Sequence, residues 1–417
     1  MAHSPAGRAT GLRGPARLGE RAARTLTIEL ARNHGPKTGL LVGAEPNSAA
    51  LAAAIGALLP GDRLTVVPAE ATPPAALRDH VAGHGPWVTD RVHVVEVLTE
   101  AEPADVVMIA EPLAGGGDET RTALEGLAKY LTTGGVLSVA VPAVPGATSG
   151  AAAELDRQGA LFGVAADLVL LNQPPVRIHR LRFTAADAAG AARLAALPRP
   201  SSVPLLGGMR IDSNGVAAAG ITLGVAALTR MARPKSKLWL LPALAAAPVA
   251  AFFRDPDRDV PDDASAVVAA SDGKVLSVQR LRDERFGDQE FLRIAVFLSV
   301  LDVHVNRAPV AGKVVDYFVA DGGFVNAMKP DAEHNVAAYT VLETPRGTVV
   351  VAQRTGLIAR RIVQRAPVGA LLARGERFGL IRFGSRTDVY LPAEAADPMV
   401  APGDRVAGGS SIIARWR

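Results

Sequence analysis

The first part of the chain, from about residue 25 to residue 184, alternates short apolar runs with segments of helical length. Runs such as GLLVGA, RLTVVPA and ADVVMIA are interspersed with segments such as NSAALAAAIGALL and TRTALEGLAKYL. Strands that alternate with helices of this length predict a mainly parallel sheet with crossover helices. The last two runs, DLVLL and RIHRLRF, suggest an antiparallel end to the sheet. We therefore expect a Rossmann-like α/β domain over residues 25–190.

A different pattern begins at about residue 264 and continues to the end of the sequence. Short alternating runs such as FLRIAVFLS, AAYTVLET and GTVVVAQRTG are separated by turns rich in Gly and Asp. Strands at this spacing are typical of a compact β-sandwich or barrel. We assign this β-rich domain to residues 254–417.

Between the two domains, residues 191–210 are rich in Ala, Pro and Ser and are predicted to be a linker. Two apolar stretches follow, at about 215–228 and 238–253, separated by a loop with four basic residues. Each is shorter than the roughly 20 apolar residues that a helix needs to cross a bilayer. We expect residues 211–253 to form a helical hairpin that dips into one leaflet, because the basic loop suits anionic headgroups. A hairpin buried in a soluble core is the alternative.

Composition narrows the possible classes of function. A chain of 417 residues is long enough for two or three domains, and 49% hydrophobic with 21% charged residues is typical of a globular protein. The absence of cysteine excludes disulfides, zinc-thiolate sites, iron–sulfur clusters and a cysteine nucleophile. Only 4% of residues are aromatic, which disfavours the stacking surfaces of single-stranded nucleic-acid binding. We expect no nucleic-acid partner and no metal.

The charge balance changes this picture little. A net charge of +4, from 45 basic and 41 acidic residues, supports only a weak preference for anionic partners. Residues 1–24 are rich in Gly, Ala and Arg and contain no apolar run that could serve as a secretory signal. We expect them to form a disordered basic tail.

Five segments of the second half, in order, resemble one enzyme family. They are FFRDPDRDVP, SDGKV, FLSVLDVHVNRAPV, QRTGLIARRIV and RFGLIRFGSRTDVYLP, between residues 252 and 392. Together they resemble the pyruvoyl-dependent phosphatidylserine decarboxylases, in particular the short bacterial form. The resemblance implies a carboxy-lyase that converts phosphatidylserine to phosphatidylethanolamine. With the hairpin, it also implies peripheral attachment to the cytoplasmic side of the cell membrane, at an anionic surface.

The Gly384-Ser385 pair within RFGSRTDVYLP resembles the self-cleavage site of that family. The resemblance implies that the Ser385 hydroxyl attacks the Gly384 carbonyl, where the missing side chain permits close approach. Elimination across the resulting ester would leave a covalent pyruvoyl cofactor at position 385 and a heterodimer of large and small chains. A second pair, Gly409-Ser410, is expected to belong to a β-turn.

A ketone suits this reaction because decarboxylation of an amino-acid headgroup leaves a carbanion that no ordinary side chain delocalises. Other enzymes use pyridoxal phosphate for this purpose. Here the resemblance implies a Schiff base between the substrate amine and the pyruvoyl ketone. Neither a metal nor a diffusible cofactor is required.

Three further residues match motifs of the same family. Asp272 in SDGKV and His304 in DVHVNRAP match its acidic residue and its histidine, and with Ser385 they could form a base-assisted nucleophile. An Asp-Gly hairpin turn and a structural histidine are the alternatives. Longer family members carry a second histidine where Arg307 stands. Either one imidazole serves both maturation and decarboxylation, or Arg307 binds the substrate carboxylate or phosphate.

The order of strands and helices in the N-terminal domain resembles the class I S-adenosylmethionine-dependent methyltransferases. Such enzymes use a Gly-rich turn after the first strand and an acidic residue at the end of the second. VGAEPNSAA contains one glycine, and Glu70 in LTVVPAEA lies late. We therefore predict a non-catalytic scaffold, with an active methyltransferase as the alternative.

A carrier protein is the alternative from a different class. The segments GGFVNAMKPD and VAPGDRVAGGSSIIA resemble biotinyl and lipoyl domains, in which Lys329 would be the modified residue. Pro330 stands where biotin acceptors usually have an apolar residue. This alternative also leaves the RFGSR and DVHVNR motifs unexplained.

Overall fold

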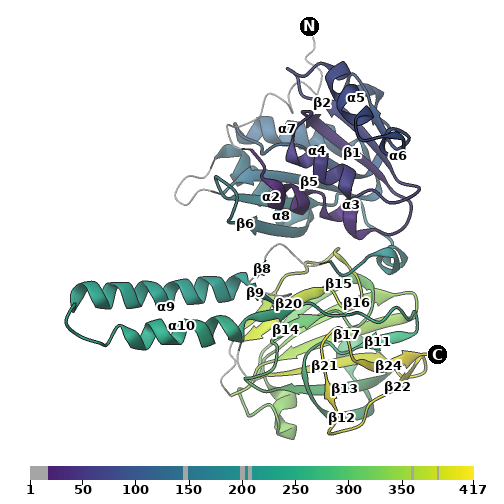
Figure 1. Ribbon diagram of the computed structural model, residues 1–417. Coiled ribbons are helices and arrows are strands. Elements are labelled where there is room, and N and C mark those ends of the chain that lie inside the picture. The colour runs from purple at the N-terminus through teal and green to yellow at the C-terminus, as the bar shows by residue number, and fades with distance from the viewer. Residues whose placement is uncertain (1–16, 144–148, 198–201, 205–208, 358–360, 383–384) are drawn as a thin grey trace. The chain divides into compact units, whose positions relative to one another are not determined.

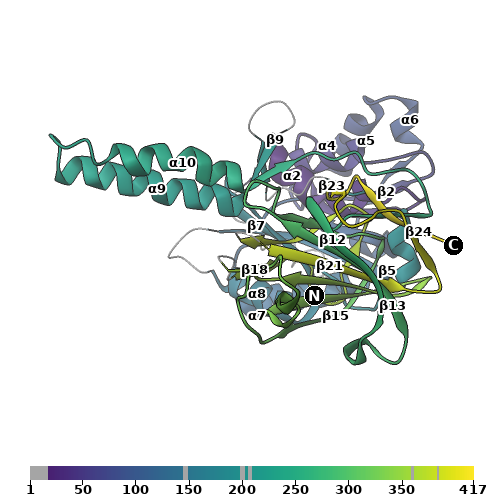
Figure 2. The ribbon, with the colours of Figure 1, turned by 90° about the horizontal axis from the view of Figure 1, so that it is seen from below.

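The computed structural model describes residues 17–143, 149–197, 202–204, 209–357, 361–382 and 385–417 (Figures 1 and 2). The chain forms two compact units. One comprises residues 1–187 and 193–195, and the other comprises residues 188–192 and 196–417.

A seven-stranded sheet forms the centre of the first unit, in the order β3-β2-β1-β4-β5-β7-β6. Its strands are β1 (Thr38–Ala44), β2 (Arg63–Pro68), β3 (Val92–Val94), β4 (Ala104–Ile109), β5 (Leu131–Pro142), β6 (Gly163–Val169) and β7 (Val176–Leu181). The first five strands are parallel, and β7 runs antiparallel to both β5 and β6. This order is that of a doubly wound sheet. The predicted Rossmann-like domain with an antiparallel end is therefore confirmed.

Helices cover both faces of this sheet. They are α2 (Glu20–Leu26), α3 (Ile28–Arg32), α4 (Ala49–Gly56), α5 (Pro74–Ala82), α6 (Pro86–Thr89), α7 (Gly117–Ala128) and α8 (Gly150–Phe162), with 3₁₀ helices η1 (Leu98–Glu100) and, near the unit boundary, η2 (Ala188–Arg193). Successive strand residues enter different cores: Leu41 packs in one cluster with residues of α2 and α4, whereas Leu40 packs in another with residues of α7 and α8. This alternation is why each strand is apolar on both sides.

The expected disordered tail over residues 1–24 is wrong at its C-terminal end. Helix α2 begins at Glu20, and Ala22, Ala23 and Leu26 are fully buried. The small Ala side chains let the helix approach the core, while Arg24 pairs with Glu20 at the surface. Residues 1–16 lie outside the described part of the chain.

The second unit begins with strands and a helical hairpin. Strands β8 (Ser202–Pro204), β9 (Met209–Asp212) and β10 (Arg254–Pro256) form a small sheet, so the predicted linker contains paired strands. Helices α9 (Ser213–Ala232) and α10 (Leu240–Phe252) lie side by side in both views (Figures 1 and 2). In α9 the buried residues are Gly215 and Ala226, so the alternative of a hairpin enclosed in a soluble core is wrong. With 20 residues, α9 is longer than expected and is long and apolar enough to cross a membrane.

The remainder of this unit is antiparallel β structure, which confirms the predicted β-rich region. Its large sheet has eight strands in the order β19-β15-β16-β17-β21-β13-β12-β23, and two three-stranded sheets have the orders β14-β20-β18 and β11-β24-β22. The strands are β11 (Ala266–Val268), β12 (Gly273–Arg282), β13 (Glu290–Leu298), β14 (Val305–Arg307), β15 (Gly312–Ala320), β16 (Ala337–Thr344), β17 (Gly347–Arg354), β18 (Arg361–Gln364), β19 (Leu371–Leu372), β20 (Arg377–Arg382), β21 (Ser385–Pro392), β22 (Ala396–Pro398), β23 (Arg405–Val406) and β24 (Ile412–Trp416), with 3₁₀ helices η3 (Glu284–Phe286) and η4 (Pro330–His334).

Candidate active site

Ser385 is the first residue of β21, a strand that lies between β17 and β13 within the large sheet. Its side chain is fully buried, and its Oγ has no hydrogen-bond partner in the described part of the chain. A buried hydroxyl without a partner costs about 1–3 kcal/mol and is therefore a feature that calls for a functional explanation. Gly384, the other half of the predicted cleavage site, lies outside the described residues.

The alternation of β21 separates its side chains onto two faces of the large sheet. Ser385 and Thr387 lie on one, which we call the Ser385 face. The Thr387 Oγ1 is 2.6 Å from the Oγ of Ser271, the residue before Asp272. The SDGKV motif therefore lies against β21, two residues from the predicted cleavage point.

His304 lies immediately before β14 and is almost completely buried. Its Nδ1 is 2.8 Å from the carbonyl oxygen of Asp302, so Nδ1 carries the proton and the lone pair is on Nε2. Burial lowers the pKa of His304 to about 4. The imidazole is therefore neutral near pH 7, as a general base must be. The Phe252 ring, at the end of α10, packs on it with 4.3 Å between ring centroids.

The carboxylate of Asp272 is held by other groups. Its Oδ2 accepts a hydrogen bond from Arg258 at 2.7 Å, and its Oδ1 accepts one from the Gly408 N–H at 2.7 Å. The partner of His304 Nδ1 is a backbone carbonyl rather than this carboxylate. Strands β11 and β12, on either side of Asp272, belong to different sheets, so the alternative of an Asp-Gly hairpin turn is wrong.

Arg307 is almost completely buried in contact with protein groups. Its Nη2 donates to Asp255 Oδ1 and to the Pro256 carbonyl, each at 2.9 Å, and its Nη1 donates to the Gly375 carbonyl at 3.2 Å. Burial and the nearby Arg377 lower the pKa of Arg307 to about 10, so it remains charged at neutral pH. These contacts favour a structural role over the substrate-binding role considered from the sequence. They also explain the buried aspartate of the FFRDP motif.

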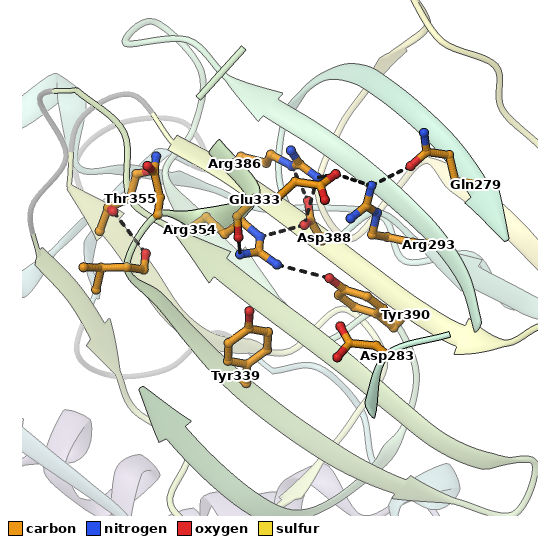
Figure 3. Close-up of polar contacts among 12 residues, drawn as sticks. Gln279, Asp283, Arg293, Glu333, Tyr339, Arg354, Thr355, Arg386, Asp388 and Tyr390 are labelled. Atoms are coloured by element: carbon orange, nitrogen blue, oxygen red, sulfur yellow. Dashed lines mark hydrogen bonds and ion pairs between the residues drawn. The ribbon is translucent and has the colours of Figure 1, made fainter. Parts of the chain in front are cut away.

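A network of ionic side chains occupies the opposite face of the sheet, which we call the arginine face (Figure 3). The fully buried Asp388 accepts hydrogen bonds from Arg354 Nε at 2.8 Å and from Arg386 Nε at 2.6 Å. Burial alone would raise the pKa of Asp388, but these guanidinium groups hold it below its usual value. Arg293 and Arg354 also donate to the side chain and the carbonyl of Glu333, respectively, each at 2.6 Å.

This network was missed by sequence reasoning, although charged residues at alternate positions of an apolar strand were a visible signal. The network connects residues on both sides of the predicted cleavage point. Arg386 and Asp388 follow the predicted cleavage point, whereas Arg293, Glu333 and Arg354 precede it. The network therefore joins what would become the two chains and holds β21, and with it residue 385, in the sheet.

The first unit carries a different candidate site. In a doubly wound sheet, ligands bind beyond the carboxyl ends of the strands where the strand order reverses, which here means β1 and β4. The backbone N–H of Leu18 donates to Glu111 Oε2 at 3.1 Å, just after β4. Arg17 pairs with Glu45, just after β1, at 3.7 Å. Leu18 also belongs to the same buried cluster as Ala44 and Ala110. The chain's own residues thus occupy this edge of the sheet.

Comparisons with known proteins give matches for the second unit. A family model described as phosphatidylserine decarboxylase matches residues 246–414. The phosphatidylserine decarboxylase proenzyme of Symbiobacterium thermophilum is 47% identical over 39% of this chain and 77% of its own length. The corresponding proenzyme of Ralstonia nicotianae is 46% identical over 42% of this chain and 80% of its own.

Similar solved structures include methyltransferases. A precorrin-6y C5,15-methyltransferase from Geobacter metallireducens is 19% identical, covers 38% of this chain and 86% of its own, and has a TM-score of 0.27. An O-methyltransferase from Bacillus cereus is 12% identical. The match covers 44% of this chain and 93% of the methyltransferase, with a TM-score of 0.30. The assignment of the doubly wound fold rests on the strand order of the first unit, not on these scores.

Proposed function

We propose that this chain, which belongs to the phosphatidylserine decarboxylase family and decarboxylates phosphatidylserine, matures by cleaving its own backbone between Gly384 and Ser385. The observation that carries the proposal is the buried, unpartnered hydroxyl of Ser385 at the start of an inner strand of the sheet. The family match also disfavours the carrier function built on Lys329.

Maturation would proceed by attack of the Ser385 Oγ on the Gly384 carbonyl carbon. The C–N bond breaks, an ester forms, and the amine of residue 385 is freed. Elimination then breaks the bond between Cβ and the ester oxygen, releasing the upstream chain as a carboxylate. The resulting dehydroalanine takes up water and loses ammonia to become a pyruvoyl group. The arginine face supports this step because it holds β21 close to the bond that breaks: Arg354 of β17 donates to Asp388 at 2.8 Å, and Arg386 pairs with Glu333 at 3.8 Å.

We propose His304 as the residue that moves protons in both stages. It is neutral, so it can accept the proton of the Ser385 hydroxyl during maturation; during turnover it would first take up a proton released by the substrate amine and then deliver that proton to the α-carbon. The pyruvoyl group would supply a ketone that takes up the substrate amine and the electron pair released with carbon dioxide. Asp272 would act as a positioning residue, since it fixes the backbone beside Ser271 and Gly408.

Intact mass of the purified protein tests the proposal directly. We expect a large chain that ends at Gly384 and a small chain of residues 385–417 whose N-terminus is blocked to Edman sequencing. The new N-terminus carries a ketone in place of an amine, which explains the block. An active preparation that contains only the intact 43.1 kDa species would contradict self-cleavage.

We further propose that the α9–α10 hairpin attaches the enzyme to the cytoplasmic side of the cell membrane. Exposed apolar side chains cover both helices, among them Ile221, Leu223, Leu228, Met231, Leu241 and Leu244. The return helix α10 has 13 residues and spans about 20 Å, less than the roughly 30 Å of a hydrocarbon core, so insertion into one leaflet is favoured.

The base of the hairpin supports this assignment. Phe252 ends α10 and packs on His304, and Asp212, which caps α9, pairs with Arg365 at 2.6 Å. The apolar hairpin therefore joins the β-rich domain beside the proposed proton-transfer residue. A lipid bound beside the hairpin would therefore have its headgroup close to His304.

Replacing Ile221, Leu228, Leu241 and Leu244 with serine is expected to reduce binding to vesicles that contain anionic lipid. The reason is the loss of apolar area that would enter the leaflet. Flotation of the protein with vesicles measures the effect. The matched control replaces Leu161, Leu170 and Leu171, which are exposed on the first unit. Equal flotation of both variants and the unaltered protein would contradict the assignment.

The first unit is proposed to be a non-catalytic scaffold. Calorimetric titration is expected to show no micromolar binding of S-adenosylmethionine, because Arg17 and Leu18 lie at the strand edge that would receive it and the Gly-rich turn is missing. A micromolar dissociation constant would overturn this prediction and restore the methyltransferase alternative.

A further inference from the structure

Two buried amide side chains on the Ser385 face are only partly satisfied. Gln353 Nε2 donates to Asn306 Oδ1 at 2.6 Å, and both residues are fully buried. Asn306 Nδ2 and Gln353 Oε1 have no partner among the described residues. The nitrogen and oxygen of each amide are assigned from hydrogen bonding. If both amides were flipped, one nitrogen and one oxygen would still have no hydrogen-bond partner. Ser271 and Thr387, on the same face, instead satisfy each other.

The sheet register brings this amide pair next to Ser385. Gln353 of β17 is directly opposite Thr387 of β21, so Ser385 is its diagonal neighbour, about 7–8 Å away and within reach of a long side chain. Asn306 lies in β14, two residues after His304. Gly379 packs against the pair, and a Cβ there would lie 2.6 Å from the Val363 carbonyl oxygen and 3.1 Å from Gln353 Nε2.

The same order of residues, a neutral polar side chain followed by an arginine, occurs on the three strands β14, β17 and β21. Asn306, Gln353 and Ser385 are each followed by an arginine. Those arginines are held elsewhere: Arg307 by Asp255, and Arg354 and Arg386 by Asp388. Neutral polar groups thus face the reacting position while the adjacent cations point away.

This arrangement suits the loss of a carboxylate. A guanidinium bound to the substrate carboxylate would stabilise the ground state more than a transition state in which that charge is leaving, and so would slow the reaction. A neutral amide N–H can orient the carboxylate without this penalty. The remaining amide oxygen can accept the N–H of the substrate amine.

We infer that the Asn306–Gln353 pair is the specificity element of the site and recognises the α-carboxylate and amine of the serine headgroup. The inference rests on the proposed function of Ser385. It assigns Asn306 and Gln353 contact with the substrate, and it predicts that they distinguish a serine headgroup from an ethanolamine headgroup, which lacks the carboxylate.

The test measures binding rather than turnover. The cleaved protein is treated with sodium borohydride, which adds hydride and a proton to the ketone, so that ligands bind without forming a covalent bond. Affinities for glycerophospho-L-serine and glycerophosphoethanolamine are then compared by calorimetry. We expect the unaltered protein to prefer the serine ligand about tenfold or more, the worth of a hydrogen bond to a charged group.

Asn306→Asp is expected to abolish this preference, because its carboxylate replaces the N–H donor and repels the ligand. Gln353→Met is the second variant and keeps the length of the side chain without the amide. Asn335→Asp is the matched control. Asn335 is also buried, but its amide is fully bonded to Val325 and Thr355, so this change should lower the melting temperature and leave the preference intact.

Retention of the tenfold preference in both Asn306→Asp and Gln353→Met would overturn the inference, as would its absence from the unaltered protein. Intact mass, recorded on the same samples before reduction, reports self-cleavage separately. A failure of maturation is thereby distinguished from a failure of headgroup recognition.

Discussion

Ser385→Ala is expected to remain a single chain of 43.1 kDa and to have no decarboxylase activity. Alanine has no oxygen to attack the Gly384 carbonyl, so neither the ester nor the pyruvoyl group can form. Because the Ser385 Oγ makes no hydrogen bond within the described structure, removing it relieves an unsatisfied buried group and should not lower the melting temperature. Gel electrophoresis and intact mass report cleavage, carbon dioxide release reports activity, and thermal unfolding reports the melting temperature.

Ser410→Ala is the matched control for this variant. Gly409-Ser410 is the second Gly-Ser pair, and Gly409 has a φ of 81°, a left-handed conformation typical of a turn. We expect Ser410→Ala to cleave and to decarboxylate normally. Cleavage of the Ser385→Ala chain at its original position would show that another nucleophile matures the enzyme.

His304→Gln is expected to slow both self-cleavage and decarboxylation by about 10² to 10⁴, the usual worth of a positioned general acid or base. Glutamine retains hydrogen-bonding capacity towards the Asp302 carbonyl but cannot shuttle a proton. The two stages are measured separately, with cleavage scored on gels and carbon dioxide release normalised to pyruvoyl content.

The depressed pKa of His304 adds a pH signature. Since its folded value is about 4 against an ordinary value of 6.5, the imidazole remains a base throughout the intervening range. We expect the acid limb of maturation attributable to His304 to lie near pH 4. The unfolded chain binds the proton more readily in this range, so the contribution of His304 to stability decreases as the pH falls from about 6.5 towards 4.

A structural histidine would give a different result. Its loss would reduce the melting temperature through an unsatisfied partner, while activity per cleaved molecule would survive. Full activity in the cleaved fraction of His304→Gln would therefore assign the proton transfer of turnover to another group.

The sequence by itself determined the parts of this protein that depend on local pattern. The alternation of apolar runs and helical segments predicted the doubly wound sheet of the first unit, because a strand buried on both faces is apolar throughout. Five ordered motifs, among them the one that contains Ser385, identified the family by resemblance, because such motifs are short and local in the sequence. The sequence pattern did not predict helix α2, which lies partly in the expected disordered tail. This helix is short, so its stability comes from packing against other elements rather than from its own residues.

Only the tertiary structure decided what the individual charged and polar residues contact. Arg307 was open to a substrate-binding interpretation until its partner, Asp255, was seen more than fifty positions away in the chain. The contacts within the arginine face and the Asn306–Gln353 pair were likewise decided by the tertiary structure, because each joins strands that are distant in sequence and adjacent only in the sheet. Pattern along a strand predicts which residues share a face, but the register between strands determines which side chain meets which, and that register is set by the packing of the whole domain.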